Sequence, residues 1–405
     1  MTAQSQTTTA PGAVRNLVLA TSAFALTFWV WNLVGPLSKT YTQNLDLSPT
    51  QTSILVAFPV LVGALGRIPV GALTDRFGGR VMFTVICWVS IIPTLLVGMD
   101  HDSFTTLLIW GFLLGIAGTS FAIGIPFVNS WFPPHRRGFA TGMFGAGMGG
   151  TALSALLTPP MAAQFGVWPT HALLAVALAV MGVVMWVFSR NAPAWQPSTE
   201  PAWPRLKDAL RLPTTWQMSL LYAIAFGGFV AFSTYLPTLL TTAYHFAQTD
   251  AGIRTAGFSL AAVIARPVGG VLSDRWGPAK VCLLSFFATA VLAVALAFQP
   301  PPELPAGAAF VLMAVALGLG TGGVFALVAT LVEPARVGTV TGLVGAAGGL
   351  GGYFPPLVMG VVFQLTDSYV IGFVLLAATA LAVGMFTLAK FGRGRSSSIS
   401  NGPGG

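Results

Sequence analysis

Long apolar stretches alternate with short polar segments along the whole chain. A transmembrane helix needs about 20 consecutive, mainly apolar residues. Twelve stretches reach roughly that length, so the pattern predicts an all-α membrane protein with twelve transmembrane helices. The predicted spans are 15–37, 51–73, 81–99, 104–131, 139–161, 168–189, 216–241, 252–273, 279–299, 306–331, 338–364 and 369–391.

The segments outside these spans suggest a division into two bundles. Residues 1–14 are polar, lack Lys and Arg, and lead into a span too long for a signal peptide, so no cleavable signal is expected. This tail and the tail 392–405 are expected to be disordered. The segment 190–215 is rich in Pro and charge and is expected to be a cytoplasmic linker. It separates two predicted six-helix bundles, 15–189 and 216–391.

Composition and charge support a membrane location and an orientation. Of the 405 residues, 55% are hydrophobic and only 7% are charged, whereas soluble domains carry about 25% charged residues. The net charge is +8, but most basic residues fall in segments on one side of the predicted membrane. This positive-inside bias predicts two cytoplasmic termini, and it explains the basic charge without a nucleic-acid partner. Cys87 and Cys282 lie within spans and are expected to be buried apolar residues.

Two arginines interrupt otherwise apolar spans. Arg67 and Arg266 each precede an Asp-Arg pair by eight residues, about 12 Å along a helix, so both are expected near the centre of the bilayer. A cation at that depth costs at least ~2.5–3.5 kcal/mol and is a functional hypothesis by default. Every acidic residue falls in a loop or at a span end, so no fixed carboxylate partner is predicted. Guanidinium groups suit planar oxyanions, and an anion site is the favoured interpretation. The alternative is a structural cation.

The chain contains an internal duplication. Residues 67–80 match residues 266–280 at an offset of 199, and residues 134–150 match residues 334–350 at an offset of 200. Two matches at nearly one offset indicate two copies of one six-helix plan. Parallel repeats of this kind are typical of transporters that bind substrate near the midplane and alternate access between the two sides.

The segments GALTDRFGGR (71–80) and GVLSDRWGPAK (270–280) resemble the paired loops of the major facilitator superfamily. The resemblance implies a cytoplasmic latch, in which Asp75 caps a helix end or pairs with an arginine such as Arg76 or Arg80. The alternative is a solvated charged turn. The expected latch residues are Asp75, Arg76, Arg80, Asp274 and Arg275.

Two glycine-rich segments, 138–160 and 338–356, resemble the signatures of the nitrate/nitrite porter family. This resemblance implies an anion gripped by Arg67 and Arg266, with aromatic packing around it. The family's first signature usually carries Asn where this chain has Met148, so a side-chain donor is missing. The expected substrate-binding residues are Arg67, Arg266, Phe121, Tyr222, Phe226, Gly145, Gly147, Met148, Gly348 and Gly349.

The expected function is secondary active transport of nitrate and nitrite across the cell membrane by alternating access. Exchange of one anion for the other is favoured, because two facing guanidiniums resist closing around an empty site. Proton-coupled nitrate uptake and transport of cyanate or a short carboxylate are the alternatives, and a non-transporting anion sensor is a distant one. The chain shows no phosphate-binding loop, metal-ligand cluster or nucleophile with a partner His. No enzyme activity, cofactor or metal is expected. The protein is expected to be a monomer in the lipid bilayer.

Overall fold

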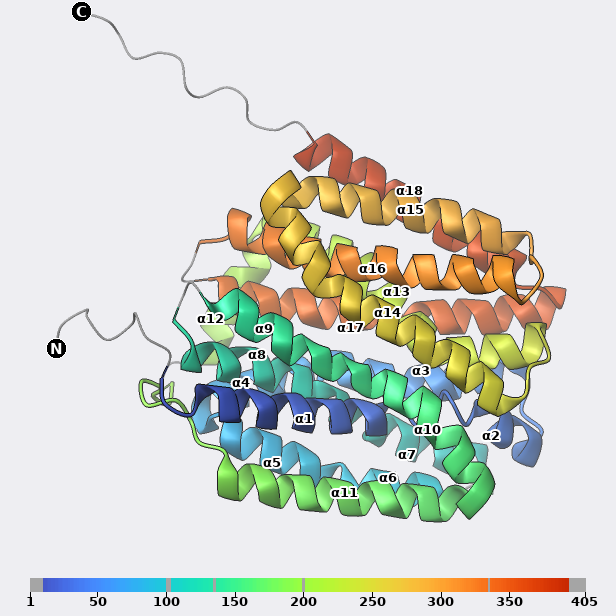
Figure 1. Ribbon diagram of the computed structural model, residues 1–405, viewed down its shortest axis with the longest axis horizontal. Helices are drawn as coiled ribbons and strands as arrows, with labels where there is room; N and C mark the ends of the chain where they lie inside the picture. Colours follow the sequence, from blue (N-terminus) through green and yellow to red (C-terminus); the bar gives the residue numbers. More distant parts are fainter. Residues whose placement is uncertain (1–9, 100–102, 134–135, 199–200, 334–335, 393–405) are drawn as a thin grey trace, which may run out of the picture.

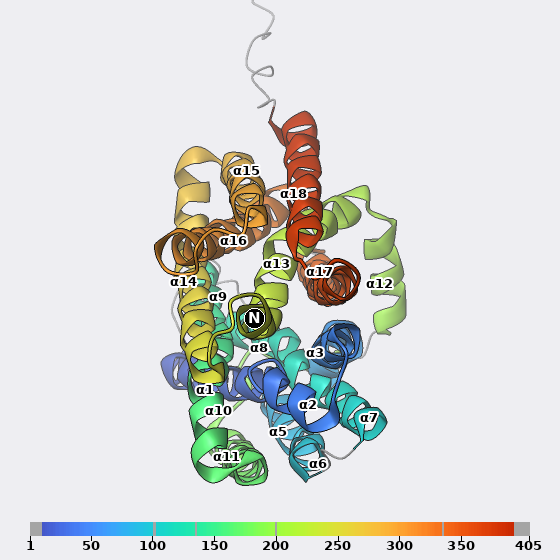
Figure 2. The same ribbon diagram turned by 90° about the vertical axis from the view of Figure 1, so that its right-hand side faces the viewer.

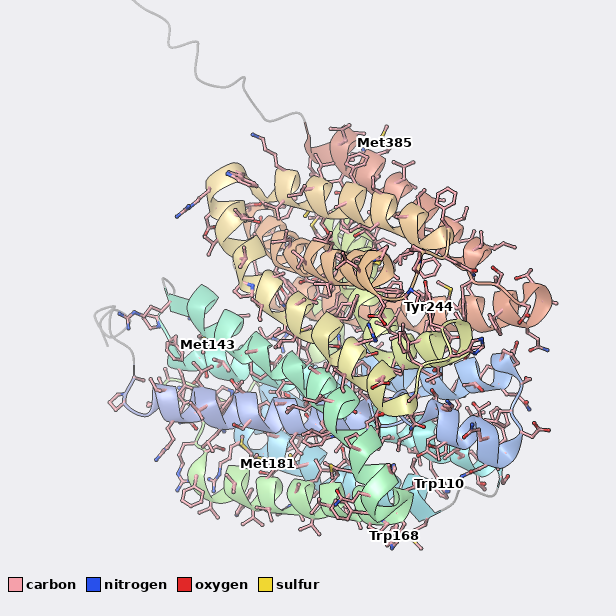
Figure 3. The ribbon with its side chains drawn as sticks, turned by 45° about the vertical axis from the view of Figure 1, so that its right-hand side comes forward. Trp110, Met143, Trp168, Met181, Tyr244 and Met385 are labelled. Atoms are coloured by element: carbon pink, nitrogen blue, oxygen red, sulfur yellow. The ribbon has the colours of Figure 1, made fainter. Side chains whose placement is uncertain are left out.

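The computed structural model describes residues 10–99, 103–133, 136–198, 201–333 and 336–392. All regular elements in these ranges are helices, and the long ones run roughly along one axis (Figure 1). The expected tails fall largely outside the described residues, although α1 already begins at Ala13 and Gly392 caps α18. Large apolar side chains such as Trp168 and Met385 project from the periphery (Figure 3), as expected for surfaces that face lipid.

The helices coincide with the predicted spans to within a few residues at most ends. Those before the predicted linker, with the short 3-10 segments η2 and η4, are α1 (Ala13–Trp31), α2 (Ser38–Leu45), α3 (Pro49–Leu65), α4 (Arg67–Phe77), α5 (Gly79–Val89), α6 (Ile91–Met99), α7 (Phe104–Leu114), η2 (Gly115–Thr119), α8 (Ser120–Trp131), α9 (Arg137–Gly145), η4 (Ala146–Gly149), α10 (Gly150–Phe165) and α11 (Val167–Phe188). Those that follow are α12 (Ala202–Arg211), α13 (Pro213–Ala243), α14 (Gln248–Trp276), α15 (Pro278–Ala297), α16 (Leu304–Leu331), α17 (Val337–Thr366) and α18 (Val370–Phe391).

Among the described residues, eleven helical segments are long and apolar enough to cross a membrane. The remaining predicted span, 139–161, corresponds to α9, η4 and α10, which together run from Arg137 to Phe165 but are divided by the 3-10 turn. The all-α fold with twelve spans is thereby confirmed.

The span that carries Arg67 is broken, whereas its counterpart is continuous. Helix α3 ends at Leu65, and α4 begins at Arg67 after Gly66. Pro69 has no N–H to donate to the Leu65 carbonyl, which favours a break at this point. Helix α14 passes through Pro267 without interruption. Arg67 therefore lies at a discontinuity in the second span.

Two helix pairs join the first six spans to the last six. Helix α3 packs along α17, and α10 packs along α14. Figure 2 looks along the long helices and shows α3 beside α17 and α10 beside α14. Arg266 lies on α14, a member of the second pair. Arg67 lies on α4, directly after α3 of the first pair. Both arginines therefore lie where the two halves meet.

Candidate anion-binding site

Arg67 is a buried cation held by a backbone carbonyl and two aromatic rings. Its side chain is 3% exposed, and Nη1 donates to the Gly345 carbonyl at 2.7 Å. Its guanidinium carbon lies 4.8 Å from the ring centroid of Phe121 and 5.2 Å from that of Phe226. Nε is buried without a hydrogen-bond partner. Among the described residues, Arg67 is the single Asp, Glu, Lys or Arg classed as buried.

Arg266 approaches the same place from the second half of the chain and is held less firmly. It is half-buried. Its Nη2 lies 3.5 Å from the Tyr222 hydroxyl oxygen, at the limit of a hydrogen bond, and its Nη1 contacts the sulfur of Met148. Its guanidinium carbon lies 5.7 Å from the centroid of Phe121. Phe121 thus contacts both guanidiniums, so their separation cannot exceed the sum of the two ring distances.

The two arginines reach across the molecule in matching ways. Arg67 of span two bonds to Gly345 of span eleven, and Arg266 of span eight lies against span five, where a Cβ on Gly145 would be 3.9 Å from its Nε. Gly145 and Gly345 correspond in the internal duplication. In the part of the chain that the structure describes, neither arginine forms an ion pair with a carboxylate.

The three predicted aromatic residues do come together. The rings of Tyr222 and Phe226 stack at 5.0 Å between centroids, and Phe121 stacks on Phe226 at 5.9 Å. Phe325 was not predicted, yet its ring lies 4.7 Å from Tyr222 and 5.4 Å from the Arg266 guanidinium carbon. At the offset of 200 Phe325 corresponds to Ile125 and not to Phe121, so the duplication gave no signal for it.

The predicted glycines divide between the site and helix packing. A Cβ on Gly349 would lie 3.6 Å from Arg67 Nη1 and only 2.7 Å from Ala64 Cβ. A Cβ on Gly348 would lie 3.0 Å from Phe226 and closer still to Tyr222. These glycines let α17 approach the site. Gly147 instead faces the ring of Phe24 on α1 and packs one helix against another.

The predicted latch has a different partner from the one expected. Asp75 forms an ion pair with Arg205 of α12, at 3.8 Å, rather than with Arg76 or Arg80. Arg80 donates from Nε to the Trp186 carbonyl at 2.9 Å, and Arg76 lies over the ring of Phe77. The side chains of both arginines are thus directed elsewhere. Among the described residues, Asp274 and Arg275 form no ion pair.

The end of the molecule that carries α2 is closed by contacts between the two halves. Gly35 abuts the Thr234 carbonyl, and Gly252 abuts the Ala155 carbonyl, so closely that neither has room for a methyl group. The Thr238 hydroxyl donates to the Ser38 hydroxyl at 2.7 Å. Further contacts between the halves at this end join Thr40 to Gln248, Gln248 to the Pro36 carbonyl, Ser53 to Tyr235, and Thr50 to Gln364.

Four glycines on the side of the arginines toward the termini have free space beside them. Gly71 and Gly270 lie one helical turn beyond Arg67 and Arg266 toward this end, and Gly142 and Gly342 lie one turn beyond Gly145 and Gly345. A methyl group at any of the four would meet no heavy atom within 4 Å. Free space beside these four glycines contrasts with the tight contacts between the halves at the end that carries α2.

Comparisons with known proteins agree with this architecture. The chain matches the Major Facilitator Superfamily over residues 20–253 and 218–404. It is 57% identical over 379 residues to a Mycobacterium tuberculosis protein named "Probable nitrate/nitrite transporter NarK2", covering 93% of this chain and 96% of the relative. It is 36% identical to the "Nitrite extrusion protein" of Bacillus subtilis, covering 88% and 89%. It is 35% identical to the "Probable nitrate/nitrite antiporter NarK1" of Thermus thermophilus, covering 86% and 85%.

Solved structures share the fold at low sequence identity. A bacterial homologue of the human lysosomal transporter Spinster, in an inward-facing and unoccupied conformation, gives a TM-score of 0.73 at 19% identity and covers 94% of this chain and 97% of its own. The human organic anion transporter MFSD10 gives 0.73 at 15% identity and covers 93% and 100%.

Proposed function

Because the chain belongs to the nitrate/nitrite porters of the major facilitator superfamily, we propose that it exchanges nitrate and nitrite across the cell membrane by alternating access. The anion lies between Arg67 and Arg266, over the face of Phe121. The observation that carries this proposal is that both guanidiniums contact one ring while no carboxylate among the described residues neutralises either of them.

The site chemistry suits a small planar anion. Each guanidinium offers paired, coplanar N–H donors that match two oxygens of a trigonal oxyanion. The unpartnered Nε of Arg67 and the weakly held Nη2 of Arg266 are donors available to such an anion. The surrounding aromatic rings exclude water, which strengthens the attraction between these charges and the anion.

The same charges favour exchange over net transport. Two unit charges at about 8 Å and an effective dielectric near 20 repel by about 2 kcal/mol. When the bundles 15–189 and 216–391 change conformation around an empty site, the two guanidiniums still repel each other. A bound anion removes this repulsion. A proton-coupled carrier normally holds a titratable group along its pathway. Among the described residues no Asp or Glu is buried, and the one buried His, His171, lies between α11 and α6 with Nδ1 bonded to the Val167 carbonyl, which favours antiport.

The orientation follows from charge. The bias of Lys and Arg toward one side supports an orientation with both termini in the cytoplasm. The end that carries the termini, where the four glycines have free space beside them, then faces the cytoplasm, and this supports an inward-facing state. One chain supplies both arginines, so the proposed working unit is a monomer.

Counterflow in liposomes tests this function. Purified protein is reconstituted in vesicles loaded with nitrite, and uptake of labelled nitrate is followed with and without internal nitrite and with and without a proton gradient. Exchange predicts uptake that requires internal anion and ignores the proton gradient. Rapid uptake into anion-free vesicles driven by acid outside would instead establish proton symport. Titration with nitrate, nitrite, cyanate and formate on wild type and Arg67→Ala identifies the preferred anion.

A further inference from the structure

A short helix lies across the end of the bundle that carries the termini. Helix α12, Ala202–Arg211, connects the two halves and packs against α13 and α17. In Figure 2, α3 and α17 are seen end-on, whereas α12 is seen from the side, lengthwise along the right-hand edge of the bundle. Its axis is therefore roughly perpendicular to the spans, which makes it parallel to the plane of the membrane.

This helix has one apolar face and one exposed face. Ala209 is buried, and Leu206 and Leu210 pack against the hydrophobic core. Trp203, Lys207 and Arg211 follow one another at intervals of four residues, so they lie along one side of the helix, and all three are exposed. Trp203 is 67% exposed, a large aromatic surface for a side chain in water.

A second exposed indole lies next to this face. Trp216, at the start of α13, is 61% exposed and donates from its ring N–H to the Leu210 carbonyl at the end of α12. Two exposed tryptophans beside two exposed cations, on a helix parallel to the membrane, are typical of a segment that lies in the headgroup region. The chain's own tails do not suit these cations, because residues 1–9 and 393–405 contain no acidic side chain.

We propose that the exposed face of α12, formed by Trp203, Lys207, Arg211 and the adjoining Trp216, binds the headgroups of anionic phospholipids in the leaflet at the terminal end. The indoles insert at the level of the headgroups, and the two cations pair with lipid phosphates. This surface is independent of the anion site between Arg67 and Arg266, and it is a site for lipid rather than for the transported ion.

The other side of α12 connects this surface to the second span. Arg205 pairs with Asp75 at 3.8 Å and donates to the Ser198 hydroxyl at 3.1 Å. The Ser198 backbone N–H donates to the Asp75 carbonyl at 3.0 Å. Asp75 lies two turns beyond Arg67 on α4. Lipid that fixes α12 therefore also holds the end of the helix that carries Arg67, and this favours the conformation seen here.

The experiment uses the full-length chain labelled at Asp208→Cys with an environment-sensitive dye. Asp208 is exposed beside Lys207, and both native cysteines are fully buried. The labelled protein is placed in nanodiscs of phosphatidylcholine containing increasing phosphatidylglycerol. The dye emission is expected to shift with the anionic fraction. Lys207→Gln/Arg211→Gln is expected to weaken the lipid binding that this shift reports by up to about fivefold for each cation removed. Added salt is expected to reduce the emission shift.

A matched pair of cations at the same end of the molecule supplies the control. Arg15→Gln/Lys280→Gln removes two exposed charges on α1 and α15 and is expected to leave the response unchanged. An emission that ignores phosphatidylglycerol, or an equal loss in both double variants, would overturn the proposal. Nitrate titration of each variant confirms that the anion site is intact, so this result is separable from the transport function.

Discussion

The sulfur of Met148 lies against Nη1 of Arg266. A thioether is a weak acceptor and offers no N–H to an anion. Arg67, by contrast, is fixed by the Gly345 carbonyl and by two aromatic rings. The site therefore combines one firmly placed guanidinium with one loosely held guanidinium, and Met148 is the residue that accounts for much of the difference.

Met148→Asn is expected to bind nitrate about tenfold more tightly than the wild type. The amide adds a donor beside Arg266, and a hydrogen bond to a charged group contributes about 1.5–3 kcal/mol. Calorimetric titration with nitrate measures the change. Met148→Leu, which keeps the volume and adds no donor, is expected to bind like the wild type. Equal affinities for the Asn and Leu variants would show that the side chain at 148 does not reach the anion.

Arg67→Met is expected to abolish nitrate binding while it stabilises the empty protein. Replacement of a buried ion pair by apolar groups of similar size is often stabilising by about 1–4 kcal/mol, and Arg67 is buried without an ionic partner among the described residues. Thermal unfolding in detergent should show a higher midpoint than the wild type without nitrate, and no further rise with nitrate. A lower midpoint would mean that the contacts of Arg67 with Gly345 and the rings outweigh the cost of its burial.

Gly142→Ala/Gly342→Ala is expected to retain nitrate binding and to slow exchange. Both methyl groups have open space here, but the terminal end must close during transport, and the opposite end closes by glycine contacts without room for a methyl group. Gly35→Ala is the matched change at the closed end, where the methyl would collide with the Thr234 carbonyl. Distances between spin labels at the two ends should shift in opposite directions for the two variants. A shift in the same direction would contradict the assignment of open and closed ends.

Ser38→Cys/Thr238→Cys is expected to form a disulfide that locks the end carrying α2. The two native hydroxyl oxygens are 2.7 Å apart, and Cys87 and Cys282 are buried and separate from them. Oxidation should stop exchange in proteoliposomes, and a reductant should restore it. The single variants under the same oxidant are the controls. Undiminished exchange after confirmed cross-linking would show that this end need not open.

The positions of the spans could be predicted from the sequence, but their interior breaks could not. The stretch predicted at 104–131 begins where α7 begins and ends where α8 ends. Hydropathy and length decide which segments cross a bilayer, and both can be calculated from the sequence. Pro69 favours the interruption at Gly66, yet Pro267 leaves α14 continuous and η4 contains no proline, so where a span breaks also depends on how neighbouring helices pack.

Part of the arrangement of the candidate site could be predicted from the sequence. The duplication and the isolated charges identified Arg67 and Arg266, and the family resemblance added Phe121, Tyr222 and Phe226. The glycines of span five occur on several sides of the helix, so the pattern could not show that Gly147 faces Phe24 whereas Gly145 faces Arg266. The pairing of Asp75 with Arg205 requires α12 to fold back beneath span two, a long-range arrangement with no local signature.

The contacts that join α2 and its neighbours to the second half differ in electrical character from those of Asp75 at the other end. The hydrogen bonds described between the halves at the end carrying α2 join hydroxyl, amide and carbonyl groups that hold no net charge over the ordinary pH range. The contacts at the terminal end include a carboxylate and a guanidinium, both partly exposed to solvent, where dissolved salt weakens their attraction. Ionic conditions on the terminal side thus act on the equilibrium between the two conformations, while those on the far side leave it largely unchanged.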